Sequence, residues 1–212
     1  MTGAALPRLE LRLLGRWVSL DVRDGVDAEG QLSRVARELI GAADDAATAR
    51  REVRNQFADV LTAARDAQAQ RVFVCREISG LPVPVAITVH SPRGLRMTPT
   101  VGTAPDAVTA TLLDSLRELE VEGVDDATRV GDAGSGILRL VHAPVEVVTT
   151  DDGERITFRR LRADYWYAVP DSKQIVLVSM TTQLGDIPTV MLRFFDAIAG
   201  AATFVDPVDA ES

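Results

Sequence analysis

The chain has 212 residues, 46% of them hydrophobic and 25% charged, and a formal net charge of -8 at pH 7. This apolar content is enough for one substantial core and excludes a largely disordered chain. We therefore expect a single domain over residues 1–205 and a short acidic tail over residues 206–212. Because the negative charge repels phosphate backbones and anionic lipid headgroups, we expect neither nucleic acid nor a membrane as partner.

The number of cysteines and the hydropathy of the chain indicate the compartment in which the protein is expected. The single cysteine, Cys75, cannot form an internal disulfide and suits a reducing compartment. Residues 1–7 lack a basic region followed by an apolar region, and no window approaches the ~18 apolar residues of a membrane span. We expect a cytoplasmic protein in which Cys75 packs as a small hydrophobe.

The first part of the chain alternates apolar and polar residues over 9–13 and 17–22, which predicts two strands of a half-buried sheet. Asp27 is a candidate cap for a helix. Residues 27–70 then carry apolar residues at helical spacing on both sides of a break at 41–45. This pattern predicts a helical hairpin, and a single bent helix is the alternative because alanine-rich sequence favours helix.

Further strands are predicted over 72–78 and 83–89, followed by a loop over 91–102. Pro105 opens the next helix, for which Thr103 is the candidate cap. Strand-like segments interrupted by glycines follow over 129–148.

The last part of the chain gives the clearest pattern. Asp151, Asp152 and Gly153 predict a hairpin turn between two strands, and strands are predicted over 155–169 and 175–180. A final helix is expected to open at Asp186 with Pro188 in its first turn. Its predicted buried face carries Ile187, Val190, Met191, Phe194, Phe195 and Ile198. Antiparallel strands combined with helices in this order predict an α+β fold.

No motif in the chain predicts catalysis, a cofactor or a metal. A structural zinc site needs about four Cys or His ligands, and the chain offers only Cys75, His90 and His142. The glycine-rich run over 131–136 lacks both the lysine and the following helix of a phosphate-binding loop, so it predicts a flexible turn. We therefore name no catalytic, cofactor-binding or metal-binding residue.

One strand carries a candidate interaction surface. Its polar side contains Arg160, Arg162, Asp164 and Trp166. Arginine and aromatic residues are enriched at interface cores, which favours a binding role for this surface. Solvated cross-strand pairs on an exposed sheet face are the alternative interpretation.

Four segments of the chain resemble the PsbP-like fold, which a photosystem extrinsic subunit and a Ran-binding transport factor share, as it occurs in small actinobacterial proteins of unassigned function. They are residues 15–20 (with Gly15 and Trp17), 167–170, 175–182 and 195–199. The resemblance implies an antiparallel sheet flanked by helices, an α/β/α sandwich, with the helical hairpin as an addition. It also implies a protein that binds other macromolecules and does not catalyse a reaction.

Two functions follow from these observations. The first is a non-catalytic interaction or accessory protein that engages a protein partner through the surface around Arg160, Arg162 and Trp166 or through the helical hairpin. The second is a small-molecule-binding protein or enzyme with a pocket between sheet and helices, lined by His90, His142 or Cys75. The sequence leaves the oligomeric state open.

Overall fold

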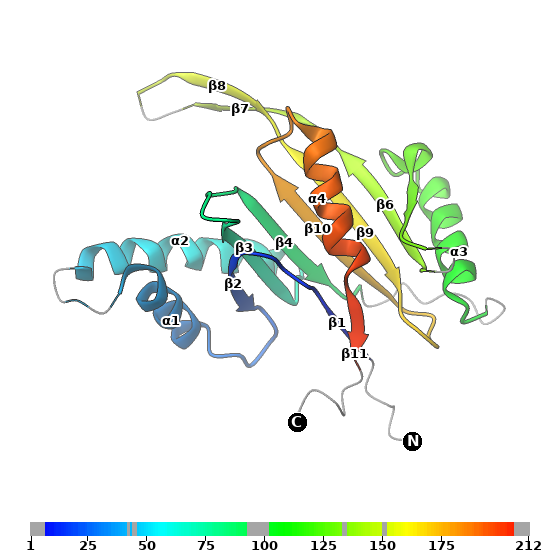
Figure 1. Ribbon diagram of the computed structural model, residues 1–212, viewed down its shortest axis with the longest axis horizontal. Coiled ribbons are helices and arrows are strands. Elements are labelled where there is room, and N and C mark those ends of the chain that lie inside the picture. The colour runs from blue at the N-terminus through cyan, green and yellow to red at the C-terminus, as the bar shows by residue number, and fades with distance from the viewer. Residues whose placement is uncertain are drawn as a thin grey trace. The chain divides into compact units, whose positions relative to one another are not determined.

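The computed structural model describes residues 7–41, 43, 46–92, 102–132, 135–149 and 152–205 (Figure 1). Over these ranges the protein is mixed α+β, with four α-helices and antiparallel strands. The chain divides into two compact units, one formed by Gly15–His90 and the other by Met1–Leu14 with Ser91–Ser212. A single domain over 1–205 stays a prediction, and the predicted acidic tail at 206–212 lies outside the described residues.

The Gly15–His90 unit combines three antiparallel strands with two helices. The strand order is β2-β3-β4. The elements are β2 (Arg16–Asp21), α1 (Ala28–Ile40), α2 (Ala47–Asp66), β3 (Arg71–Glu77) and β4 (Val85–His90). Both helices contribute to one core with the strands, and this core includes Leu20, Leu32, Leu61 and Val72. Helix α1 ends at Ile40 and helix α2 begins at Ala47.

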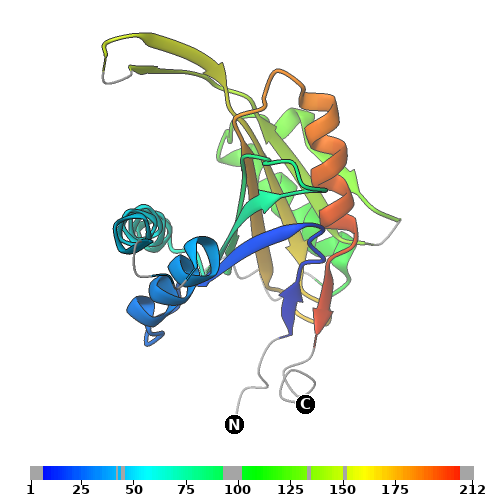
Figure 2. The same ribbon diagram turned by 60° about the vertical axis from the view of Figure 1, so that its left-hand side comes forward.

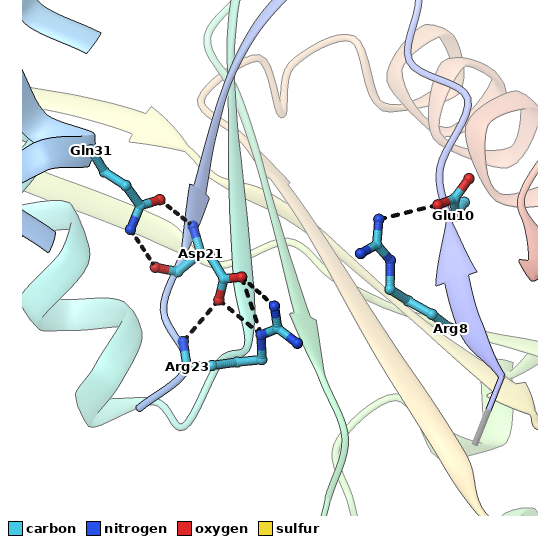
Figure 3. Close-up of polar contacts among 5 residues, drawn as sticks. All are labelled: Arg8, Glu10, Asp21, Arg23 and Gln31. Atoms are coloured by element: carbon cyan, nitrogen blue, oxygen red, sulfur yellow. Dashed lines mark hydrogen bonds and ion pairs between the residues drawn. The ribbon is translucent and has the colours of Figure 1, made fainter. Parts of the chain in front are cut away.

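Two polar side chains fix the start of α1. The Asp27 carboxylate accepts a hydrogen bond from the Gly30 amide at 2.9 Å, so the predicted cap is confirmed. One turn along, the Gln31 side chain reaches the backbone of Asp21 at the end of β2 (Figure 3). Hydrogen bonding to Arg23 holds the pKa of the Asp21 carboxyl below its usual value.

The second unit contains a four-stranded antiparallel part with the order β10-β9-β6-β5. These strands are β5 (Thr128–Val130), β6 (Ile137–His142), β9 (Leu161–Ala168) and β10 (Ile175–Thr182). Two further pairs are β1 (Arg8–Glu10) with β11 (Thr203–Val205), and β7 (Val145–Thr149) with β8 (Arg155–Arg159). The helices are α3 (Pro105–Glu118), the 3-10 turn η2 (Val124–Asp126) and α4 (Pro188–Gly200).

Alternate residues of β9 contact different helices. Trp166 and Ala168 pack with the core that α3 forms with Leu138 and Leu140 of β6. The odd-numbered tyrosines face α4, where the Tyr165 hydroxyl donates to Asp196 at 2.8 Å and the Tyr167 hydroxyl donates to the Ala199 carbonyl at 3.2 Å. Because successive side chains of a strand point to opposite faces, α3 and α4 cover opposite faces of β9.

The predicted start of α3 at Pro105 is confirmed, whereas the predicted cap of α3 and the predicted start of α4 were wrong. Ala104, and not Thr103, precedes α3, and no side chain caps that helix. Helix α4 begins at Pro188, two residues after the predicted Asp186, and again has no side-chain cap. In both helices a proline occupies the first turn, where its fixed φ starts the helix and its missing N–H leaves one donor fewer to satisfy.

The predicted buried face of α4 is confirmed only in part. Met191, Phe195 and Ile198 are buried, whereas Ile187 and Val190 are 47% and 61% exposed. The helix is apolar around most of its circumference, so spacing alone did not separate the buried side from the exposed one.

Candidate functional site

The strand predicted to carry an interaction surface is β9, and its cross-strand register extends that surface to two residues that sequence reasoning missed. Arg162, Asp164 and Trp166 share one face of β9, as their alternation predicted. Ser179 of β10 pairs with Asp164, and His142 of β6 pairs with Arg162. Sequence alone contains no signal for these neighbours, because they depend on which strands pair and in which register.

The carboxylate of Asp164 is the centre of this cluster. It accepts a hydrogen bond from the Ser179 hydroxyl at 2.6 Å, lies 3.2 Å from Nε of Arg162 and lies 3.5 Å from Nε2 of His142. The Asp164 and His142 side chains are only 13% and 10% exposed. We call Asp164, Ser179, Arg162 and His142 the Asp164 cluster.

The chemistry of the Asp164 cluster differs from that of a catalytic triad. In a triad a histidine accepts the proton of the nucleophilic serine, and a carboxylate orients that histidine. Here the carboxylate of Asp164 itself accepts the hydrogen bond from the Ser179 hydroxyl. A hydroxyl that donates to a carboxylate paired with arginine is held in one orientation by that hydrogen bond. The arrangement pairs a mostly buried carboxylate on the sheet face with hydrogen-bond donors of the chain.

Arg160 and Trp166, the other two members of the predicted surface, lie in different surroundings. Arg160 lies before β9, contacts Glu146 of β7 at 2.9 Å and donates its amide proton to the Pro144 carbonyl. Trp166 is half-buried against the α3 core, and its indole nitrogen is buried with no hydrogen-bond partner among the described residues. The four residues therefore form a partly covered surface whose charges pair within the chain.

The residues of the pocket hypothesis lie in both units. Cys75 is buried in β3, and burial raises the pKa of its thiol. His90 ends β4, with its Nε2 2.9 Å from the Thr88 hydroxyl, whereas His142 belongs to the Asp164 cluster of the other unit. Across the described ranges, no three His, Cys, Asp or Glu side chains gather as a metal site would require. Parts of the glycine-rich run and of the 151–153 turn lie outside those ranges.

The β7–β8 hairpin carries several exposed large apolar side chains. Its two strands form a separate two-stranded sheet, which stands away from the four-stranded part (Figures 1 and 2). Val145, Val147, Val148 and Ile156 are between 47% and 59% exposed. The register places Val145 opposite Arg159 and Val147 opposite Thr157 on one face, and Val148 opposite Ile156 on the other. Each face of the hairpin therefore carries two exposed large apolar side chains.

The base of this hairpin is joined to the start of α4. The Gly185 amide donates to the Arg159 carbonyl at 3.0 Å, and Nε of Arg159 lies 4.0 Å from the Asp186 carboxylate. The exposed Ile187 and Val190 follow directly. We call the exposed apolar residues of these two joined elements the hairpin–helix surface, which consists of Val145 and Val147 of the hairpin and Ile187 and Val190 at the start of α4.

None of the helices in the described ranges has the length and apolar character needed to cross a membrane. No protein-family model, curated protein or solved structure matches this chain.

Proposed function

We propose that this chain is a non-catalytic interaction or accessory protein that binds a protein partner through the hairpin–helix surface. The observation that carries the proposal is the exposure of Val145, Val147, Ile187 and Val190 on two elements that the Gly185–Arg159 backbone hydrogen bond connects. Single exposed apolar residues are ordinary, but large apolar residues gathered on adjoining elements are typical of an interaction site.

The charges around this surface support a protein as the partner. Arg155 and Arg159 lie on the same hairpin face as Val145 and Val147, while the whole chain carries a net charge of -8. A partner with an apolar segment flanked by carboxylates fits this combination. The phosphate backbone of a nucleic acid would be attracted by two arginines and repelled by the rest of the chain.

The stability of the hairpin supports the same proposal. An isolated two-stranded hairpin is marginally stable in water, because it lacks a third strand or a helix to cover its apolar face. The β7 and β8 strands pair with each other and with no other strand of the described chain. A bound partner would bury the apolar face of the hairpin and so stabilise it. The exposed valines are therefore suited to a binding role.

The surface predicted from the sequence is the second location that we propose for a partner. Arg160 and Arg162 are still 45% and 47% exposed, although each contacts a carboxylate of the chain. Rim positions of this kind affect association rate and specificity more than affinity. We therefore expect Arg160 and Arg162 to contribute less than Val147 and Val190.

The test is native mass spectrometry of the protein purified gently from its own host. The wild-type chain should carry a stoichiometric protein partner, and a variant with Val147→Thr and Val190→Gln should lose it. A variant with Arg160→Ala and Arg162→Ala tests the second location. Retention of the partner by both variants, or a small molecule bound to a chain without a partner, would contradict the proposal, and the small molecule would favour the pocket hypothesis.

The finer architecture that accompanies this proposal is an α/β/α sandwich with the helical hairpin over 27–70, of the PsbP-like type, in an actinobacterial cytoplasmic protein. It is supported by the α+β class and by the contacts of α3 and α4 with the two faces of β9. The fold type, the source and the location are proposals.

A further inference from the structure

We propose that the second face of the β7–β8 hairpin is a self-association surface, on which two copies of this chain stack their hairpins face to face. This face carries Val148 and Ile156 as a directly opposed pair, with Phe158 next to them opposite Glu146. Val148 and Ile156 are 48% and 47% exposed. The proposal is independent of the one above, because it uses the opposite face of the hairpin.

The charges on this face favour a second copy of the chain. Glu146 lies 2.9 Å from Arg160, so the two charges at the base of the face cancel. Two copies that each carry a net charge of -8 repel each other over most of their surface. A neutral apolar face is a place where they can meet without bringing like charges together.

The other face of the hairpin does not suit a second copy. It carries Arg155 and Arg159 beside its valines, so stacking that face on itself would bring four arginines together. A contact related by a two-fold axis uses the same patch on both copies, and therefore requires a self-complementary patch. The face with Val148 and Ile156 meets that requirement, and the face with Val145 and Val147 does not.

Stacking would also complete the hairpin as a structure. Two sheets pack face to face at about 10 Å with their apolar residues interdigitated, so two stacked hairpins form a small four-stranded sandwich. Each strand has five residues, or about 17 Å, and the buried area is therefore well below the ~800 Å² per partner of a standard interface. We expect a weak dimer that forms as protein concentration rises.

Sedimentation velocity over a concentration series tests this proposal. The wild-type chain should shift from monomer toward dimer, and a variant with Val148→Thr and Ile156→Thr should stay monomeric over the same range. Threonine is β-branched and keeps the strand preference of the hairpin, so the variant removes apolar contact and leaves the fold intact. The matched control is Val145→Thr with Val147→Thr on the opposite face, which should dimerise like the wild type.

A cross-linking experiment gives an independent readout. Val148→Cys places an exposed thiol on the proposed contact, whereas the native Cys75 is buried. Mild oxidation should give a covalent dimer of the Val148→Cys chain and none of the wild type or of a Val147→Cys control. A wild type that stays monomeric at every concentration, a dimer that survives Val148→Thr with Ile156→Thr, or equal cross-linking of the two cysteine variants would overturn the proposal.

The proposal of a protein partner and the proposal of a dimer can each be contradicted without affecting the other. Loss of the protein partner in the variant with Val147→Thr and Val190→Gln concerns the hairpin–helix surface alone. Loss of the dimer in the variant with Val148→Thr and Ile156→Thr concerns the opposite face alone. A wild-type chain that stays monomeric, together with loss of a different protein from the native mass spectrum of the variant with Val148→Thr and Ile156→Thr, would keep the interaction role and reject the dimer.

Discussion

The side-chain amide of Gln31 makes both hydrogen bonds that the backbone of Asp21 offers at the end of β2 (Figure 3). Its oxygen accepts from the Asp21 amide at 2.8 Å, and its nitrogen donates to the Asp21 carbonyl at 3.0 Å. Gln31 is 7% exposed and belongs to the first turns of α1. The glutamine therefore replaces a neighbouring strand at this point and attaches the helix to the sheet.

Replacing Gln31 should destabilise the fold. Gln31→Ala leaves the Asp21 amide and carbonyl without their partner, and we expect the free energy of unfolding to fall by about 2 kcal/mol. Gln31→Glu keeps an acceptor but loses the donor, and its charge faces a carbonyl, so we expect at least the same loss. Urea denaturation at pH 7 measures both changes. The matched control is Gln56→Ala at an exposed position of α2, and equal losses at the two sites would contradict the assigned role.

Asp196 of α4 holds together two groups from different strands. Its carboxylate contacts Nη1 of Arg139 at 2.5 Å and accepts a hydrogen bond from the Tyr165 hydroxyl at 2.8 Å. Arg139 is 16% exposed, and its Nε is buried without a partner among the described residues. Removing Asp196 would therefore leave a mostly buried guanidinium with its charge unpaired.

We expect Asp196→Ala to lower the free energy of unfolding by about 3 kcal/mol, and Tyr165→Phe to lower it by about 1 kcal/mol. Because both changes break the same hydrogen bond, the double variant should lose less than the sum of the two. Denaturant titration of the four proteins tests this, with Asp186→Ala as the control. Asp186 is 83% exposed and should contribute close to nothing. Strict additivity would show that the contact is absent in solution.

The parts of the fold that sequence predicted are those that depend on local chemistry. The Asp27 cap, the alternation of β9 and the proline near the start of each of two helices are properties of a few neighbouring residues. Two features depend on distant partners and were missed. Ser179 and His142 join Asp164 only through strand register, and the exposure of Val190 depends on which side of α4 meets the sheet.

The β7–β8 hairpin shows that local sequence patterns also could not predict the neighbours of the site residues. Its valines alternate and predict strand, but alternation does not say whether a strand joins a sheet or stands apart from it. The predicted surface around Arg160 was placed on the neighbouring strand. The structure places Arg160 against Glu146 of the hairpin, so the arginine neutralises one face of the hairpin as well as flanking β9.

Alkaline titration should show that both tyrosines resist ionisation. Burial, with the Asp196 hydrogen bond in second place, raises the pKa of Tyr165, and burial also raises the pKa of Tyr167. These are the only tyrosines of the chain. A raised folded pKa contributes stability that is complete below the unfolded value of about 10 and is lost as pH rises above it.

Absorbance at 295 nm therefore should not rise near pH 10 in the folded protein. It should rise at higher pH, together with the loss of the circular dichroism signal, because the tyrosines ionise as the chain unfolds. In urea the same titration should give an ordinary curve with a midpoint of about 10. Tyr165→Phe should halve the absorbance change. A normal tyrosine titration in a chain that is still folded would show that α4 does not cover β9 as the structure has it.

The last prediction concerns Gly185, which lies against the backbone at the base of the β7–β8 hairpin. A Cβ at this position would lie 2.3 Å from the Arg159 carbonyl oxygen and 2.8 Å from the Arg159 carbonyl carbon. Backbone atoms cannot move aside as a flexible side chain does, so Gly185→Ala must separate the start of α4 from the hairpin. We expect the free energy of unfolding to fall by about 1–3 kcal/mol.

Limited trypsin digestion gives the local readout for this change. Arg155, Arg159 and Arg160 are exposed cleavage sites in or beside β8, and Gly185→Ala should speed cleavage at them because the hairpin loses its attachment. Gly200→Ala at the end of α4 is the matched control, since its added Cβ meets no atom within 4 Å. It should leave both stability and cleavage unchanged or slightly improved. Equal behaviour of the two variants would show that the base of the hairpin is not packed against Gly185, and the hairpin–helix surface would then lose the contact that joins its two halves.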